Sequence, residues 1–390
     1  MKFKDMVEFE LNIQKDRLRY IETALKNQTF CNFPPRKIYI EPTNICNYKC
    51  THCVHNGAMS RKPGYLDVDL YKRRLDEIDF LRLHSKIQFT GVGEPLLHPH
   101  WDQIIRYASD KGFFTLMNSN ASFFTPENSE KLVKSGLDYL HVSIDGITKA
   151  TYEKIRHGGV FENVIENLFN LFEARHKANG YHLAIILGII DQNRNKSELQ
   201  DCIDFFTKWP FHHVVKGELF NHMGEIEEAN LIHADDQLNS WSSYPMCNTP
   251  WDLLSINCDG QAVGCNYDFD NRFVIGSLHE ESFLELWNSD RMQFFRQSIL
   301  DHTYNEIEGN GSMCSACSIK WQKDYHLPAC FSTEIKRMES YLGRAIHRCA
   351  NHVERNLEFR EMETILFKHK ADILNTVSNG DILSPFNDAS

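Results

Sequence analysis

Three cysteines early in the chain have the spacing of metal-cluster ligands. Cys46, Cys50 and Cys53 fall within eight residues, directly after a short apolar run typical of a strand. Three thiolates can hold three irons of a four-iron cluster, and the fourth iron then has an open position that can bind and reduce a substrate. The alternative is a zinc knuckle, in which His52 and His55 would complete the four ligands that structural zinc requires.

Four more cysteines form a second group late in the chain. They are Cys247, Cys265, Cys314 and Cys317, with twelve residues between Cys247 and Gly260 and four residues between Gly260 and Cys265. Four thiolates can hold another iron-sulfur cluster, and on chemical grounds they can equally hold zinc. The two groups contain seven of the twelve cysteines, which indicates metal ligation rather than disulfide bonds.

The composition is that of an ordinary globular protein. The chain has 390 residues, of which 42% are hydrophobic and 24% charged, and its net charge is −11. This charge gives no general attraction for nucleic acid. The longest apolar run, residues 183–190, is too short to cross a bilayer, and the charged N-terminus does not resemble a secretory signal. We therefore expect a cytoplasmic protein with no nucleic-acid or membrane partner.

Short apolar runs alternate with longer amphipathic segments from residue 37 onward. The predicted strands are residues 37–43, 86–92, 114–120, 139–145, 182–190 and 212–220. The predicted helices between them are residues 69–83, 101–111, 126–135, 161–178 and 196–208. This alternation predicts an α/β fold with a parallel sheet and right-handed crossovers.

The sequence has polar and glycine-containing motifs where these strands end. They are Thr90-Gly91-Val92-Gly93-Glu94-Pro95, Asn118-Ser119-Asn120, Ser143-Ile144-Asp145-Gly146, Arg156 and Asp191-Gln192-Asn193. Glycines let the main chain approach a ligand closely, although a glycine pair before proline is also common in a plain turn. The fork of a guanidinium suits a carboxylate. Since the carboxyl ends of parallel strands meet at one edge, these residues are candidates for one ligand site.

The cysteine triplet and these motifs resemble the radical S-adenosylmethionine (SAM) superfamily. The resemblance implies a partial (β/α)6 TIM-like barrel, with a SAM-binding [4Fe-4S] cluster on Cys46, Cys50 and Cys53. It implies that the segment with Gly91, Gly93 and Glu94, where Val92 replaces a family glycine, receives the amino group of SAM. By the same resemblance Asn118 and Ser119 match the family's Thr-Asn-Gly position, and Ser143 and Asp145 match a Ser-x-Asp-Gly segment. Ser143 and Arg156 would hold the SAM carboxylate, and Asn193 would contact its adenine and ribose.

The second cysteine group resembles the SPASM and twitch auxiliary-cluster domains. Residues 259–265 read as a β-hairpin in the expected position. A full SPASM domain has seven cysteines and two clusters, but Lys323 and Leu327 occupy the places of the next two. This difference favours the twitch form, with one auxiliary [4Fe-4S] cluster on the four cysteines. The expected domains are an N-terminal helical extension (1–36), the barrel (37–243), the auxiliary-cluster domain (244–330) and a helical C-terminal extension (331–390).

The resemblance implies an oxidoreductase that cleaves SAM reductively and uses the resulting 5'-deoxyadenosyl radical to abstract hydrogen. The expected substrate is a small polar metabolite such as a sugar, aminocyclitol or nucleotide-linked sugar, which is oxidised or epimerised. The alternatives are a maturase that crosslinks or epimerises a ribosomal peptide, and a non-catalytic iron-sulfur redox protein. Cys258 and Cys330 are candidate hydrogen donors, and each could equally be a substitute ligand or a buried packing residue. The expected partners are a flavodoxin- or ferredoxin-type electron donor and, through the C-terminal helices, a second copy of the chain.

Overall fold

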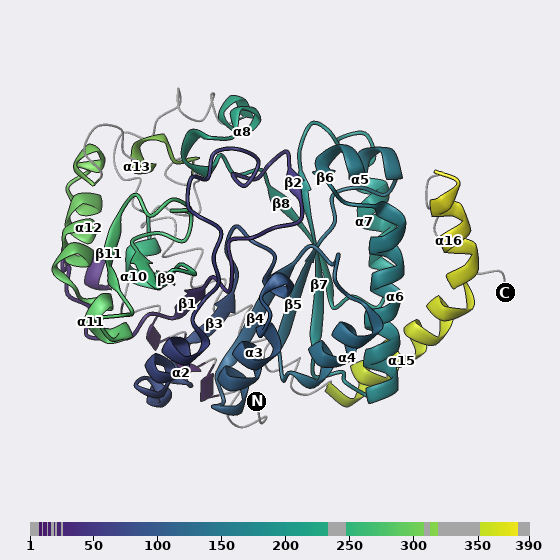
Figure 1. The fold of residues 1–390 in the computed structure, drawn as a ribbon, viewed down its shortest axis with the longest axis horizontal. Helices are drawn as coiled ribbons and strands as arrows, with labels where there is room; N and C mark the ends of the chain where they lie inside the picture. Colours follow the sequence, from purple (N-terminus) through teal and green to yellow (C-terminus); the bar gives the residue numbers. More distant parts are fainter. Residues whose placement is uncertain are drawn as a thin grey trace.

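The computed structural model describes residues 26–232, 247–307, 313–318 and 352–380, together with scattered residues between 8 and 24. Part of the expected N-terminal helix lies outside the described residues, as do Lys323, Leu327 and Cys330. In the described part, one sheet of nine strands has the order β11-β10-β9-β1-β3-β4-β5-β7-β8, and Figure 1 shows helices packed along it.

Six strands of this sheet are parallel and follow the chain order. They are β1 (Lys37–Ile40), β3 (Lys86–Phe89), β4 (Phe114–Ser119), β5 (Tyr139–Ser143), β7 (Ala184–Asp191) and β8 (His213–Glu218). Every strand expected from the sequence is present, which confirms the partial TIM-like barrel. Burial alternates along β1, β3 and β4: Ile38 and Ile87 are fully buried, whereas Tyr39, Gln88 and Asn118 line a cavity.

The crossover helices begin and end where the local sequence dictates. They are α2 (Val68–Asp76), α3 (Trp101–Asp110), α4 (Pro126–Lys134), α5 (Lys149–Ile155), α6 (Phe161–Ala178) and α7 (Leu199–Thr207), with short turns η1 (Asp79–Leu81) and η2 (Pro95–Leu97). The side chain of Asp67 caps α2, and Thr125 caps α4 just before Pro126. Helix α6 ends at Asn179, whose φ of 51° is left-handed.

The sheet continues without interruption into the second half of the chain. Strand β9 (Leu253–Ile256) pairs in parallel with β1, and β10 (Gln261–Val263) and β11 (Val274–Ser277) follow in antiparallel order. The predicted hairpin is therefore confirmed as β9–β10. The helices of this half are α10 (Thr249–Asp252), α11 (Phe283–Trp287), α12 (Asp290–Leu300) and α13 (Met313–Ala316), with the turn η4 (Tyr304–Glu306).

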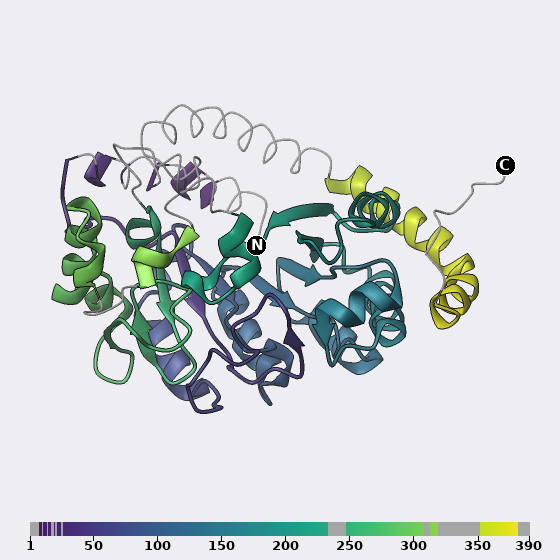
Figure 2. The ribbon, with the colours of Figure 1, turned by 90° about the horizontal axis from the view of Figure 1, so that it is seen from above.

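Two C-terminal helices pack on the barrel. Helices α15 (His352–Lys368) and α16 (Lys370–Ser378) both contact α6, at one end of the molecule in Figure 2. Arg175 of α6 and Glu363 of α15 form a fully buried ion pair of 2.7 Å, and the Tyr181 hydroxyl donates to the same carboxylate at 2.7 Å. No helix in the described part of the chain is long and apolar enough to cross a bilayer. The homodimer through these helices stays a prediction.

Candidate active site

The loop that carries Cys46, Cys50 and Cys53 follows β1 and is held against the barrel by a short ribbon. Strand β2 (Lys49–Cys50) pairs with β6 (Arg156–His157), which places Cys50 opposite Arg156. Gly158 has a φ of +93°, and a Cβ there would lie 2.9 Å from the Asn47 carbonyl oxygen. The ribbon thus brings a buried guanidinium to the thiols, a pairing that sequence spacing alone does not show.

Cys50 is buried, Cys46 and Cys53 are half-buried, and the three thiols are electrostatically coupled. Burial raises the pKa of Cys46 to about 11 and that of Cys50 to about 12, and it also raises the pKa of Cys53. The Arg156 charge opposes this effect at all three sulfurs. Buried thiolates therefore need further positive charge, which bound iron supplies.

The Gly91–Glu94 segment packs directly beneath this loop. A Cβ at Gly93 would lie 2.1 Å from the Thr43 carbonyl oxygen, and the Glu94 amide donates to the Ile45 carbonyl at 2.9 Å. A Cβ at Gly91 would lie 2.4 Å from Cγ of Glu41. The structure therefore requires both glycines for close packing of main chain and side chain.

Glu94 is fixed by the strand end that follows β4. Its carboxylate accepts hydrogen bonds from the Ser119 hydroxyl at 2.9 Å and the Asn120 amide at 2.8 Å. Burial outweighs these donors and raises the pKa of Glu94 to about 7. Asn118 points elsewhere: it lines the cavity described below, where its Oδ1 lies 3.4 Å from Nε2 of Gln88.

Asp145 and Arg156 form a buried ion pair of 2.6 Å beside the cysteine loop. Asp145 also accepts from the Ile190 amide at 2.8 Å and lies 3.8 Å from Nε2 of His52. Ser143 is the last residue of β5, opposite Gly188 of β7. Asn193 is exposed, and its backbone amide donates to Glu228 at 2.7 Å.

Several buried polar atoms near the loop have no partner within the described residues. They are Oγ1 of Thr51, Nδ1 of His52, Nδ1 of His55, Nε of Arg156 and both amide atoms of Gln192. Unpaired buried polar groups are costly, so their gathering here fits a polar ligand. In the part of the chain that the structure describes, no three His, Cys, Asp or Glu side chains are grouped to hold a single metal ion.

The second cysteine group converges beyond β10. Burial raises the pKa of Cys265 well above its ordinary value, and the neighbouring Cys247, Cys317 and Cys314 raise it further. Cys314 and Cys317 lie at one turn, where the Cys317 amide donates to the Cys314 carbonyl at 3.4 Å. The four thiols, which come from three separate segments, therefore lie close enough to one another to be electrostatically coupled.

A cavity of about 210 Å³ lies between the barrel strands and the segment after Cys265. Its wall includes Tyr39, Glu41, Arg61, Gln88, Thr90, Gly91, Val92, Asn118, His222, Ser255, Asn257, Asn266, Tyr267, Asp268 and Phe269. Residues from both halves of the chain thus share one cavity. Sequence reasoning missed most of this wall, although Glu41, at the end of the first strand, could have been found by the strand-end rule.

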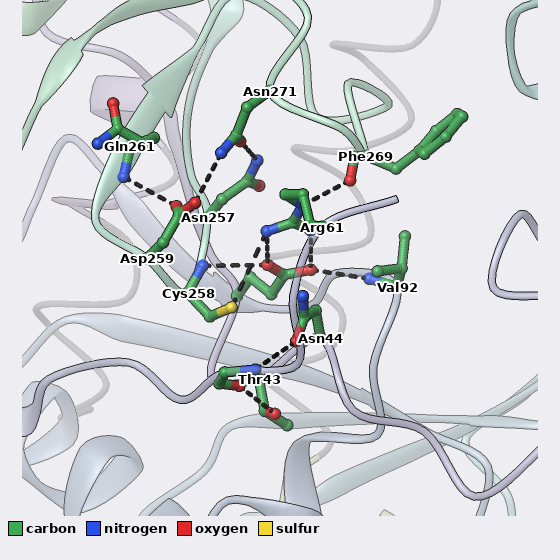
Figure 3. A network of polar contacts seen from close by, with 12 residues as sticks. Thr43, Asn44, Arg61, Val92, Asn257, Cys258, Asp259, Gln261, Phe269 and Asn271 are labelled. Carbon is green, nitrogen blue, oxygen red and sulfur yellow. Dashed lines mark hydrogen bonds and ion pairs between the residues drawn. The ribbon is translucent and has the colours of Figure 1, made fainter. Parts of the chain in front are cut away.

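Glu41 is the centre of a polar network at this cavity, and Figure 3 labels its partners Arg61, Val92 and Cys258. Arg61 donates to both its oxygens, at 2.8 and 3.0 Å, and also to the Phe269 carbonyl at 2.6 Å. The amides of Cys258 and Val92 donate to Glu41 at 3.0 and 3.2 Å. The thiol of Cys258 is buried 3.9 Å from Nη1 of Arg61 and is not part of the cavity wall.

Comparison with known proteins gives two family matches. Residues 40–205 match the radical SAM superfamily, and residues 247–318 match the SPASM iron-sulfur cluster-binding domain. The second match contains all four cysteines of the second group and ends before Lys323.

Three relatives match most of the chain. The Fe-coproporphyrin III synthase of Methanosarcina barkeri is 30% identical over 330 residues, covering 72% of this chain and 79% of the relative. A tungsten-containing aldehyde ferredoxin oxidoreductase cofactor-modifying protein of Pyrococcus furiosus is 21% identical, covering 74% and 88%. The SAM-dependent 2-deoxy-scyllo-inosamine dehydrogenase of Niallia circulans is 20% identical, covering 74% and 96%.

A solved structure shares the fold. Streptococcus suis SuiB bound to the precursor peptide SuiA has a TM-score of 0.55 and 13% sequence identity, covering 79% of this chain and 74% of SuiB.

Proposed function

The chain belongs to the radical SAM superfamily and carries a SPASM iron-sulfur cluster-binding domain, and from this premise we propose that it oxidises or epimerises a small polar metabolite. When bound, the first cluster and SAM supply one-electron cleavage of SAM, which yields the group that abstracts hydrogen. The observation that carries the proposal is the 210 Å³ cavity, which is smaller than the roughly 300–1,000 Å³ typical of pockets for drug-sized ligands.

The residues around the first cysteine group support cofactor binding. Cys46, Cys50 and Cys53 would hold the cluster. Gly91 and Gly93 would hold this segment against the cysteine loop at the place of the SAM amino group, and Glu94 would face that group with a carboxylate fixed by Ser119. Because Asp145 holds Arg156 in place, it would act as a positioning residue, and the unpaired Nε of Arg156 would meet the SAM carboxylate together with Ser143.

Two further contacts belong to this proposal. Asn193 would contact adenine and ribose from the loop after β7, and the adjacent Gln192 is the stronger candidate because its buried amide is unpaired in the described structure. Cys247, Cys265, Cys314 and Cys317 would hold one auxiliary cluster. A flavodoxin- or ferredoxin-type protein would deliver the electron.

The main competing substrates are those of the relatives. A peptide or an iron porphyrin is far larger than the cavity of about 210 Å³, so only part of either molecule would enter it. The polar character of the wall, with its side-chain amides and hydroxyls, supports a metabolite with several hydrogen-bonding groups.

The test uses anaerobically purified enzyme with both clusters loaded. Formation of 5'-deoxyadenosine is followed by mass spectrometry with SAM alone, with a small-metabolite extract, with a peptide extract, and with Fe-coproporphyrin III. We expect the small-metabolite extract to raise the rate several-fold over SAM alone. Stimulation by only the peptides or only the iron porphyrin would contradict the proposal, and no SAM cleavage under any condition would contradict the enzyme assignment itself.

A cysteine substitution separates epimerisation from oxidation. An epimerase must return a hydrogen atom to the substrate, and Cys258 is the donor candidate within the described residues. If the enzyme is an epimerase, Cys258→Ala is expected to keep SAM cleavage and lose the epimerised product. Cys202→Ala is the control, because Cys202 is also buried but lies in α7, whereas Cys258 contacts Glu41 and Arg61 of the cavity wall. A dehydrogenase would make its product normally in both variants.

A further inference from the structure

The charged side chains of the cavity wall already have hydrogen-bond partners within the protein. Glu41 and Arg61 neutralise each other through two hydrogen bonds. The carboxylate of Asp268 accepts from the backbone amides of Arg272 at 2.8 Å and Phe273 at 2.7 Å, within its own turn. These charged groups therefore bind other groups of the protein and are not available to pair with a charged ligand.

The remaining polar groups on the described wall are uncharged. They are the amides of Gln88, Asn118, Asn257 and Asn266, the hydroxyls of Tyr39, Thr90, Ser255 and Tyr267, and the imidazole of His222. Burying a charge without an opposite partner is strongly unfavourable, whereas hydroxyl groups can pair with amides and hydroxyls. The cavity therefore suits an uncharged ligand that bears hydroxyl groups.

His222 is held in this wall by a strained turn. It begins η3 (His222–Gly224) with a φ of 45°, and Met223 follows with a φ of 60°. Two successive non-glycine residues in the left-handed region cost about 1–3 kcal/mol each and persist only where the surroundings fix them. Such strain is concentrated at functional sites.

The group that fixes the turn is the buried Asn221. Its side chain donates to the Ala316 carbonyl at 2.8 Å and accepts from the Ser318 amide at 3.0 Å. These residues flank Cys317 of the second cysteine group. The position of His222 is therefore tied to the proposed auxiliary centre.

The surroundings of His222 keep its imidazole uncharged. Its ring lies beside those of Phe220 and Tyr267, with centroids 5.1 and 5.8 Å away. Burial, with a smaller contribution from His52, lowers the pKa of His222 to about 4. A neutral imidazole has one nitrogen free to accept a proton or a hydrogen bond.

We propose that His222 accepts the proton from a hydroxyl group of an uncharged substrate in this cavity, an inference that rests on the proposed function. In the oxidation of an alcohol to a ketone, the carbon loses a hydrogen atom to the SAM-derived group and the oxygen loses its proton to the imidazole. The one electron that remains requires an acceptor of the iron-sulfur class. Loss of the hydrogen atom makes the hydroxyl more acidic, which favours this proton transfer.

The substrate class is tested by separating the small-metabolite extract into neutral, cationic and anionic pools. Formation of 5'-deoxyadenosine by the cluster-loaded enzyme is measured with each pool. We expect the neutral pool to stimulate. Stimulation by only a charged pool would overturn the uncharged-substrate inference while leaving the proposed function intact, and failure of every pool would overturn both.

The role of His222 is tested with the stimulating pool. In His222→Gln the side chain still accepts a hydrogen bond but cannot take a proton. We expect little change in the concentration of the metabolite pool that gives the half-maximal rate. The maximal rate of product formation should fall about 10²–10⁴-fold, which is the usual contribution of a general base. His213→Gln on the exposed strand β8 is the control and should match the wild type.

The His222→Gly variant separates loss of the imidazole from a folding defect, because glycine adopts this left-handed backbone without strain. The denaturation midpoint and the iron content of this variant should match those of the wild type, and free imidazole should restore part of its product formation. Wild-type product formation by His222→Gln, or a His222→Gly variant that imidazole does not rescue, would overturn the role.

Discussion

The contact beneath the cysteine loop predicts that Gly93→Ala is severely damaging. The new Cβ would lie 2.1 Å from one carbonyl oxygen and 2.7 Å from another, so the two segments would have to separate by roughly 1 Å to reach an acceptable distance. That movement would break the 2.9 Å hydrogen bond from Glu94 to Ile45. Overpacking of about 1–3 kcal/mol and a lost buried hydrogen bond of about 1–3 kcal/mol give a cost of roughly 2–6 kcal/mol. This is a large share of the about 5–15 kcal/mol that stabilises a typical protein.

The assay is urea denaturation under anaerobic conditions, together with the iron content of the purified protein. Gly217→Ala is the matched control, because a Cβ there has its nearest neighbour at 3.8 Å, the Ile189 carbonyl oxygen. We expect Gly217→Ala to be neutral or slightly stabilising and Gly93→Ala to unfold at much lower urea and to retain less iron. Equal denaturation midpoints for the two variants would refute the reasoning.

Three further predictions concern other parts of the chain. Burial raises the pKa of Glu94 from 4.5 to about 7. The wild type without SAM should therefore lose up to about 3 kcal/mol of unfolding free energy as the pH rises between these values. A Glu94→Gln variant whose unfolding free energy falls with pH in the same way would contradict this. Cys265→Ser should lower the iron content from about eight to about four atoms per chain, and an unchanged content would exclude it as a cluster ligand. Glu363→Gln leaves Arg175 buried without its partner and should cost about 3–5 kcal/mol in thermal or chemical unfolding, whereas Glu358→Gln, exposed on the same helix, should cost almost nothing.

The fold was largely predictable because it depends on local patterns. The six parallel strands and the helix Phe161–Ala178 follow from apolar periodicity, which burial in a parallel sheet enforces. The hairpin after Cys247 was also predicted, but its pairing with β1 was not, since contact between residues about 215 positions apart leaves no local signal.

Site residues could be predicted from the sequence only where they belong to a single sequence motif. The close approach at Gly91 and Gly93 follows from the residue type, and the gathering of the four late cysteines follows from their spacing. The Glu41–Arg61 pair and the cavity position of His222 depend on segments that meet only after folding. Arg156 meets Asp145 for the same reason, so its ion pair could not be read from the sequence.

Because β1 pairs with β3 on one edge and with β9 on the other, the register of the sheet fixes the distance between the two cysteine groups. Lys37 to Ile40 are matched residue by residue to Leu253 to Ile256, and this strand leads directly into one cysteine loop while β9 leads through the hairpin to Cys265. A slip of one residue would move β9 by about 3.3 Å and turn its side chains to the opposite face. An insertion within either strand would therefore change the separation of the two cysteine groups, whereas insertions in the connecting loops would leave it intact.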